Sequence, residues 1–173
     1  MSLRFFHKLG ASLLDRRSLC GGIREQAYLS TFGPVPGMPL QQASLAKLVI
    51  VWGNNATCCN LHLMRHINAA KRQGAKLVVI DPQKTDVARL ADLWIRVRPG
   101  SDGALAMGFL KVIIEEGLYD RDIVENRTVG FEKLREHVKT FSLDDVEKAT
   151  WVPKNEIEAF AALYVRIKPA AMQ

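Results

Sequence analysis

The chain has 173 residues, of which 48% are hydrophobic and 24% are charged, and its formal net charge is +6. This composition is ordinary for a soluble globular protein of one domain and excludes a largely disordered chain. The basic residues are scattered among acidic ones and form no run with interleaved aromatic side chains, so the charge does not indicate nucleic-acid binding. A phosphate-bearing small molecule is the better-motivated partner.

The three cysteines, two of them adjacent (Cys58 and Cys59), do not form the even, spaced framework of a disulfide-stapled secreted protein. We therefore expect reduced thiols, which favours a cytoplasmic location. No stretch approaches the roughly 18 apolar residues that a membrane span needs. Residues 1–20 also lack the unbroken apolar core of a secretion signal, so the sequence predicts neither a span nor a signal peptide.

The first 46 residues predict short helices around a loop. Apolar side chains at helical spacing predict helices over 2–14 and 20–32, and a short helical turn over 42–46. Between them, residues 33–39 contain three prolines. Prolines lack N–H donors and restrict the residues before them, so this segment is predicted to be a loop.

From residue 48 onward, short apolar runs alternate with helical segments. This alternation favours right-handed parallel crossovers. It predicts strands over 48–52, 76–80 and 93–97, and helices over 60–73, 85–91, 102–116 and 153–166 with short helical pieces between the last two. The expected fold is α/β, a doubly wound, mainly parallel, Rossmann-like sheet with flanking helices in a single dinucleotide-binding domain spanning 1–173.

Polar or turn-forming residues follow each predicted strand directly, where a parallel sheet presents a ligand site. After the first strand, Gly53 permits positive φ and close backbone approach, and Asn55 offers both a donor and an acceptor. The pair suits a phosphate or pterin oxygen. Taken alone, it is more often a plain strand-ending turn.

The other two strand ends carry carboxylates. Asp81, in Asp81-Pro82, either bonds a ribose diol, as in dinucleotide-binding folds, or caps its own backbone turn. After the third strand, Gly100 and Ser101 offer amide donors to an anion, and Asp102 can accept two donors from a guanine edge. Helix capping explains this last stretch almost as well. The coincidence of all three at one sheet edge favours a nucleotide site.

Several stretches in one order carry a resemblance to a known family. They are Val51-Trp52-Gly53-Asn54-Asn55, Ala69-Ala70-Lys71-Arg72-Gln73-Gly74, Ala75-Lys76-Leu77-Val78-Val79-Ile80-Asp81-Pro82, Ala91-Asp92-Leu93-Trp94, Arg98-Pro99-Gly100-Ser101-Asp102-Gly103-Ala104-Leu105 and Ile113-Ile114-Glu115-Glu116-Gly117-Leu118-Tyr119-Asp120. Together they resemble the molybdopterin guanine dinucleotide-dependent oxidoreductases, which include formate dehydrogenases, periplasmic nitrate reductases and dimethyl sulfoxide reductases. The resemblance is strongest over residues 48–131.

The resemblance implies a cofactor-binding set of Gly53, Asn55, Asp81, Pro82, Lys84, Gly100 and Asp102. Gly53 and Asn55 would line the phosphate and pterin side of one molybdopterin guanine dinucleotide carrying Mo or W. Asp81 would hold the ribose and Asp102 the guanine base. Lys84 would supply positive charge, because Gln83 stands where many relatives have Arg. Cys20 falls roughly where the family's catalytic metal ligand sits, a role that suits a soft thiolate, although a small buried thiol is an equally open interpretation.

The chain also departs from the family. Many relatives have Pro after the Asn of the first motif and a His-Pro pair further on, where this chain has Ala56 and Asn60-Leu61. The amino-terminal iron–sulfur segment and the carboxyl-terminal domain that grips a second dinucleotide are absent from the sequence. We therefore expect an internal fragment of a catalytic subunit, a truncated product or one piece of a split subunit, with any iron–sulfur cluster in the missing amino-terminal segment.

Two classes of function follow. In the first, the chain is the cofactor-binding portion of a molybdenum or tungsten oxidoreductase, works with the remaining domains or subunits, and does not turn over alone. In the second, it is a non-catalytic remnant that binds a nucleotide or a partner protein. Metal and pterin analysis of the purified protein distinguishes the two.

Overall fold

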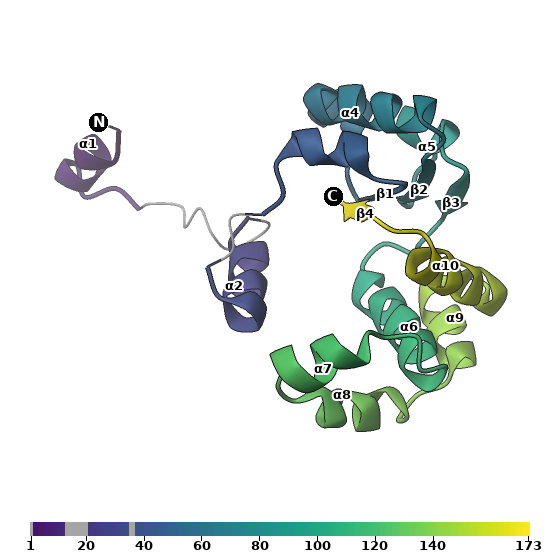
Figure 1. The fold of residues 1–173 in the computed structure, drawn as a ribbon. Helices are drawn as coiled ribbons and strands as arrows, with labels where there is room; N and C mark the ends of the chain where they lie inside the picture. The colour runs from purple at the N-terminus through teal and green to yellow at the C-terminus, as the bar shows by residue number, and fades with distance from the viewer. Residues whose placement is uncertain (1, 13–20, 35–36) are drawn as a thin grey trace. The chain divides into compact units, whose positions relative to one another are not determined.

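The computed structural model describes residues 2–12, 21–34 and 37–173 (Figure 1). The chain divides into two compact units, residues 1–38 and residues 39–173. The first unit contains α1 (Ser2–Lys8) and α2 (Gly21–Phe32). The described part of the predicted loop 33–39 contains no helix or strand.

Helix α1 ends earlier than the predicted helix 2–14. Gly10 has a left-handed φ of 65°, and the Ala11 N–H donates to the Phe6 carbonyl at 3.1 Å. A glycine in this conformation lets the chain turn back and satisfy the last carbonyls of a helix, which stops the helix. The predicted helix 20–32 matches α2 in its described residues.

A four-stranded parallel sheet forms the centre of the second unit. Its strands lie in the order β3-β2-β1-β4, with β1 (Leu48–Trp52), β2 (Lys76–Ile80), β3 (Leu93–Ile95) and β4 (Ala170–Met172). All three pairings are parallel, so the three predicted strands and their direction are confirmed. β3 is shorter than the predicted 93–97 because its partner β2 ends at Ile80, opposite Ile95.

The sequence pattern did not predict β4. Its Ala-Ala-Met sequence has little β propensity, and it becomes a strand through pairing with Leu48–Ile50 of β1. The pairing continues past β4, where the Trp52 N–H donates to the Gln173 carbonyl at 2.8 Å. The chain thus steps outward from β1 to β2 and β3 and then returns to the other side of β1. The strand order reverses between β1 and β4, and open α/β sheets bind ligands outside the carboxyl ends of their strands at such a reversal.

Helices cover both faces of the sheet (Figure 1). The 3₁₀ helix η1 (Leu40–Leu45), α4 (Leu61–Arg72) and α5 (Asp86–Arg89) pack on one face, against a core that includes Val49, Val51, Leu77 and Val79. On the other face, α6 (Asp102–Glu115), α9 (Leu143–Thr150) and α10 (Lys154–Arg166) pack on the alternate strand residues, including Leu48, Ile50, Val78 and Ile80. Successive strand residues point to opposite faces, so a doubly covered sheet needs both sets to be apolar. The predicted doubly wound α/β fold is confirmed.

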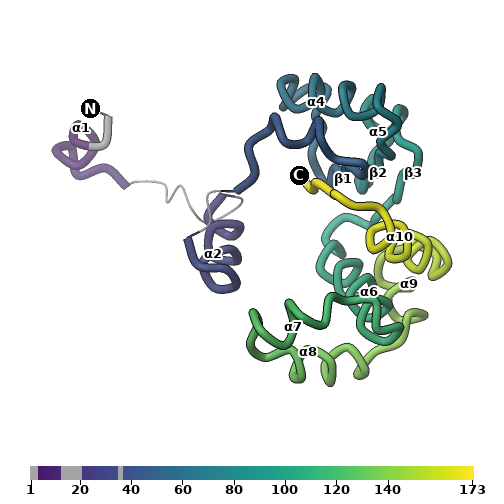
Figure 2. Tube along the Cα trace, viewed as in Figure 1, coloured from purple at the N-terminus to yellow at the C-terminus, as the bar shows by residue number. Residues whose placement is uncertain are grey.

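The remaining helices are short, as predicted for the segment after residue 118. The trace in Figure 2 passes from α6 through α7 (Arg121–Arg127) and α8 (Phe131–Val138) before α9 and α10 return it to the sheet. Helix α9 begins with a capping box in which the Ser142 and Asp145 side chains each bond the other residue's backbone N–H. Helix α6 begins at Asp102, within the predicted boundary. None of the helices in the described ranges combines the length and apolar character needed to cross a bilayer.

Asp92 joins the amino-terminal ends of β2 and β3. Its carboxylate accepts the Leu77 N–H at 2.8 Å and the Lys76 Nζ at 3.1 Å, and the Lys71 Nζ lies 3.6 Å away. Burial by itself raises the pKa of Asp92, but the Leu77 N–H and the two lysines outweigh it and hold the pKa below its ordinary value of 3.8. The ionised carboxylate therefore stabilises the fold.

We expect Asp92→Asn to lower the free energy of unfolding at pH 7. A carboxyl group with a depressed folded-state pKa stabilises the protein above its unfolded pKa, and this contribution disappears as the pH falls through the folded pKa. The difference between the variant and the parent should therefore shrink below about pH 4. Urea unfolding of both proteins between pH 7 and pH 3 measures it, and a difference independent of pH would contradict the assigned contacts.

Gly108 allows α6 to approach α9 closely. A Cβ at this position would lie 2.8 Å from the Val146 Cγ1 and 3.5 Å from the Ile157 Cγ2. The β-branched Val146 side chain is stiff and cannot move aside cheaply. We expect Gly108→Ala to lower the free energy of unfolding by about 1–3 kcal/mol in urea denaturation.

Gly103→Ala is the matched control on the same helix. A Cβ at Gly103 would meet no atom within 4 Å. Because alanine favours helix, this variant should be neutral or more stable by up to about 1 kcal/mol. Equal effects of the two substitutions would mean that the contact at Gly108 does not limit the helix packing.

Candidate functional site

The three strand-end stretches lie side by side at the carboxyl edge of the sheet. The Gly53 N–H donates to the Ile80 carbonyl at 2.9 Å, and the Asp81 N–H donates to the Ile95 carbonyl at 3.2 Å. The Trp52 Nε1–H donates to the Asp102 Oδ1 at 2.7 Å and so joins the first stretch to the third. The structure thus brings together the strand ends that carry the predicted cofactor residues.

The first strand end offers open backbone and one amide side chain. Gly53 is exposed with a left-handed φ of 63°, and a Cβ there would meet no atom within 4 Å. The half-buried Asn55 accepts the Thr57 hydroxyl at 2.7 Å through Oδ1. Its carbonyl accepts the N–H groups of Cys58 and Cys59, which lie in the short helix α3 (Ala56–Cys59). The side-chain NH₂ of Asn55 has no acceptor among the described residues, so a ligand oxygen can take that place.

Asp81 carries the only buried carboxylate in the described part of the chain. Its Oδ1 accepts the Gln83 N–H at 2.8 Å, so the interpretation as a turn cap is correct. No donor from the described residues bonds Oδ2. Oδ2 is therefore open to a hydroxyl donor supplied by a ligand. The half-buried Pro82 follows it directly.

The third strand end does not use its side chains to cap the helix. Ser101 is the N-cap of α6, yet its hydroxyl donates to the Arg98 carbonyl at 2.7 Å and makes no cap hydrogen bond. Asp102 is exposed and accepts the Trp52 indole. Gly100 is exposed with a φ of 83°. Helix capping therefore does not account for the Asp102 side chain.

The sequence pattern did not indicate two tryptophans that bond these aspartates, one at the carboxylate and one at the backbone. Trp52 bonds the Asp102 carboxylate, and the Trp94 Nε1–H donates to the Asp81 carbonyl at 2.9 Å. The Lys84 Nζ lies 5.4 Å from the centroid of the Trp94 ring. Their positions in the sequence could have indicated this role, because each tryptophan lies in or at the end of a strand that is followed by polar strand-end residues.

The departures from the family motif at Ala56 and Asn60 have local structural roles. The Asn60 side chain accepts the Leu63 N–H at 3.2 Å and is the N-cap of α4. Asparagine is among the best residues for this position. Ala56 is fully buried in the core on the α4 face. In the loop after β1, Ala56 and Asn60 thus have structural roles of their own at the positions where many relatives have Pro and His-Pro.

Cys20 lies outside the described residues, so its assignment as metal ligand and catalytic residue stays a prediction. Within the described ranges, no group of three or more His, Cys, Asp or Glu side chains is arranged to hold a metal ion. Cys58 and Cys59 are exposed free thiols.

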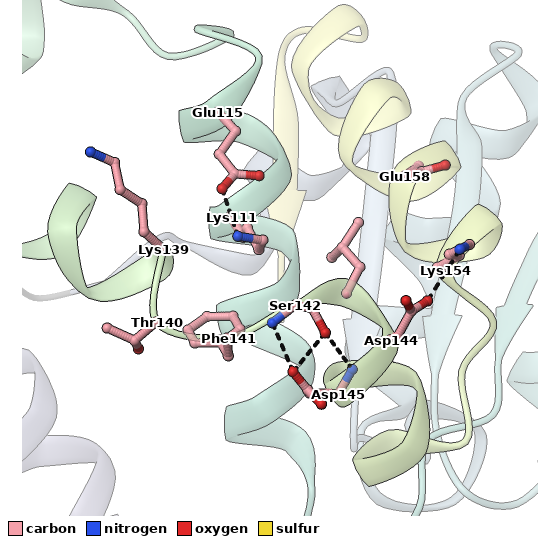
Figure 3. A pocket seen from close by; sticks show the side chains of 11 residues that line it. Lys111, Glu115, Lys139, Thr140, Phe141, Ser142, Asp144, Asp145, Lys154 and Glu158 are labelled. Atoms are coloured by element: carbon pink, nitrogen blue, oxygen red, sulfur yellow. Dashed lines mark hydrogen bonds and ion pairs between the residues drawn. The ribbon is translucent and has the colours of Figure 1, made fainter.

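Side chains of α6, α9, α10 and the segment before α9 line a hollow of about 580 Å³ (Figure 3). Its lining includes Lys111 and Glu115 in the last turns of α6, whereas Asp102 of the strand-end site is at the start of that helix. Its three lysines are already paired with carboxylates: Lys111 with Glu115, Lys139 with Glu136 and Lys154 with Asp144. Mixed, paired charges do not favour a phosphate, so this hollow does not suit a nucleotide. Its lining consists of Lys111, Glu115, Lys139, Thr140, Phe141, Ser142, Leu143, Asp144, Asp145, Lys154 and Glu158.

Comparison with known proteins identifies the family. Residues 4–170 match the family profile described as "Molybdopterin oxidoreductase". The chain belongs to the molybdopterin oxidoreductase family. This membership agrees with the strand-end motifs and implies a molybdopterin cofactor with Mo or W.

Two curated relatives and one solved structure place the chain within longer proteins. "Probable oxidoreductase YoaE" of Bacillus subtilis is 37% identical over 170 residues, which cover 98% of this chain and 25% of YoaE. Formate dehydrogenase H of Escherichia coli is 42% identical over 125 residues, which cover 72% of this chain and 18% of that enzyme. The structure of acetylene hydratase from Pelobacter acetylenicus matches with a TM-score of 0.80 at 34% identity over 88% of this chain and 21% of that protein. The chain spans a quarter or less of these relatives' lengths, so in these relatives further sequence accompanies the matching region.

Proposed function

We propose that the chain is the cofactor-binding portion of a molybdenum or tungsten oxidoreductase and binds the guanine dinucleotide part of molybdopterin guanine dinucleotide. One observation carries the proposal: Gly53, Asp81 and the Gly100–Asp102 stretch follow the carboxyl ends of three neighbouring parallel strands, and the Trp52–Asp102 hydrogen bond joins the first stretch to the third. Open α/β sheets bind nucleotides at such a position.

The residues fit the cofactor by their chemistry. Gly53 and Gly100 leave open space beside the backbone, which suits a bulky phosphate group. The free amide of Asn55 and the exposed Lys84 suit phosphate and pterin oxygens. The Asp81 Oδ2 suits a ribose hydroxyl beside Pro82, and Asp102 suits the two N–H donors of a guanine edge.

The bound cofactor would supply the redox chemistry through its metal, while this chain binds and orients it. Cys20 is proposed as the thiolate ligand of that metal. The remaining domains or subunits of the oxidoreductase are the proposed partners, which the short span of the chain relative to its relatives supports. The same short span supports the alternative, a remnant that binds a nucleotide or a partner without turnover.

Metal and pterin analysis tests the proposal against the alternative. If the chain holds the cofactor, protein purified from cells that make molybdopterin should contain pterin, seen by fluorescence after oxidation, together with Mo or W. Protein that contains neither but still binds guanosine monophosphate (GMP) would support the non-catalytic alternative.

The 173-residue chain by itself should show no oxidoreductase turnover, because it spans a quarter or less of its relatives' lengths. Assays with formate, nitrate or a sulfoxide and an artificial electron carrier measure this. Turnover well above a cofactor-only control would contradict the proposal that other domains or subunits are required.

The two carboxylates should differ in which nucleotides they affect. Asp102→Asn places an amide donor against a donor of guanine and should weaken GMP binding by about 1.5–3 kcal/mol, with little effect on adenosine monophosphate (AMP). Asp81→Asn should weaken both nucleotides alike, because both contain the ribose. Binding titrations of GMP and AMP to the parent and the two variants measure this. Equal losses of GMP and AMP in Asp102→Asn would rule out a base-reading role.

A further inference from the structure

Trp52 meets α6 because of two simple periodicities. Leu48, Ile50 and Trp52 alternate along β1, so all three face the side of the sheet that α6 covers. On α6, Asp102 and Phe109 are seven residues apart and therefore share one face. The Trp52 ring packs edge-on against the Phe109 ring, with 5.9 Å between centroids, and its Nε1–H reaches the Asp102 Oδ1 at 2.7 Å.

This hydrogen bond leaves most of the Asp102 carboxylate available. A carboxylate has about four lone-pair sites, and the indole occupies one of them. Among the described residues, no lysine, arginine or histidine forms an ion pair with Asp102, although the chain carries a net charge of +6. An exposed carboxylate is thus held by a neutral donor on a half-buried ring, with room for two further donors.

We propose that Trp52 is a positioning residue that orients the Asp102 carboxylate toward the Watson–Crick edge of guanine and so sets the preference for guanine over adenine. This inference rests on the proposed function of Asp102. The neutral indole fixes the carboxylate and leaves its negative charge in place. A lysine or arginine at the same position would neutralise that charge. The ring contact with Phe109 fixes the indole in turn.

The competing explanation is that the Trp52–Asp102 hydrogen bond only fastens the end of β1 to the start of α6. A hydrogen bond with only this structural role contributes to stability but does not change the relative affinity for guanine and adenine. A positioning bond affects selectivity: without it, the Asp102 side chain spreads over about three staggered χ1 wells. Selectivity for guanine should then fall by about three- to tenfold.

The test uses Trp52→Phe, which removes the donor and retains a ring against Phe109. Trp94→Phe is the matched control, because it removes an indole donor at the same sheet edge that bonds the Asp81 backbone carbonyl instead of a carboxylate. Binding of GMP and AMP is titrated for the parent, both tryptophan variants and Asp102→Asn. The indole N–H signals of the three tryptophans are followed by NMR during the titrations of the parent.

If Trp52 positions Asp102, Trp52→Phe lowers the ratio of GMP to AMP affinity by about three- to tenfold, and Trp94→Phe leaves the ratio unchanged. Asp102→Asn should lower the ratio by about tenfold or more. In the parent, GMP should shift the Trp52 indole signal more than AMP does. This last measurement remains decisive if Trp52→Phe does not fold.

The failures are distinguishable. If Asp102→Asn loses the guanine preference but Trp52→Phe keeps it, the bond is only a fastening and the positioning role is overturned, while the proposed function stands. An indole signal of Trp52 that responds equally to GMP and AMP also overturns the positioning role. If the parent binds GMP no better than AMP, both the guanine-binding proposal and the role of Trp52 are overturned.

Discussion

The structure depends on the burial of the first four residues of β1. Leu48, Val49, Ile50 and Val51 are at most 2% exposed, with β2 on one edge of the strand and β4 on the other. Their side chains enter the cores on both faces of the sheet. A buried strand must hydrogen-bond its N–H and C=O groups and surround its side chains with apolar atoms, which requires neighbours on all four sides. The helices of both layers and the return of the chain to β4 meet this requirement.

The same arrangement creates the candidate site. A strand enclosed on all sides is open to solvent chiefly at its ends, and parallel pairing places the carboxyl ends of β1, β2 and β3 at one edge. Gly53, Asp81 and Gly100 follow these ends, far apart in the sequence and adjacent in the fold. Asp92 lies at the opposite edge and is fully engaged by the Leu77 N–H and by lysines, so it has a structural role. Residues at the amino-terminal ends of the strands thus stabilise the fold, and residues at the carboxyl ends form the candidate ligand site.

The two carboxylates of the site are held in different ways. Asp81 is buried and braced by its own turn, and Trp94 supports its backbone. Asp102 is exposed and braced by Trp52, across the interface between sheet and helix. The one unpaired oxygen of Asp81 suits a single hydroxyl donor, whereas an exposed carboxylate with several free lone pairs can take a bidentate partner. This difference is the physical basis for the proposal that Asp81 binds ribose and Asp102 a base.

The sequence by itself determined the strands over 48–52 and 76–80, the start of β3, the helices α4 and α5 and the positions of the strand-end residues, because apolar periodicity and glycine or aspartate turns are local signals. It did not determine β4, since Ala170–Met172 has no strand pattern and becomes a strand only through its pairing with β1. It also left open whether Asp81 and Asp102 cap backbone or face a ligand. The structure shows that Asp81 caps its own turn through one oxygen, by a bond to the N–H of Gln83. Tertiary structure alone decided that Trp52 holds Asp102, because a hydrogen bond between residues 50 positions apart depends on the packing of α6 against β1. Spacing in the sequence specifies which face of an element a side chain occupies, and only packing specifies what that face meets.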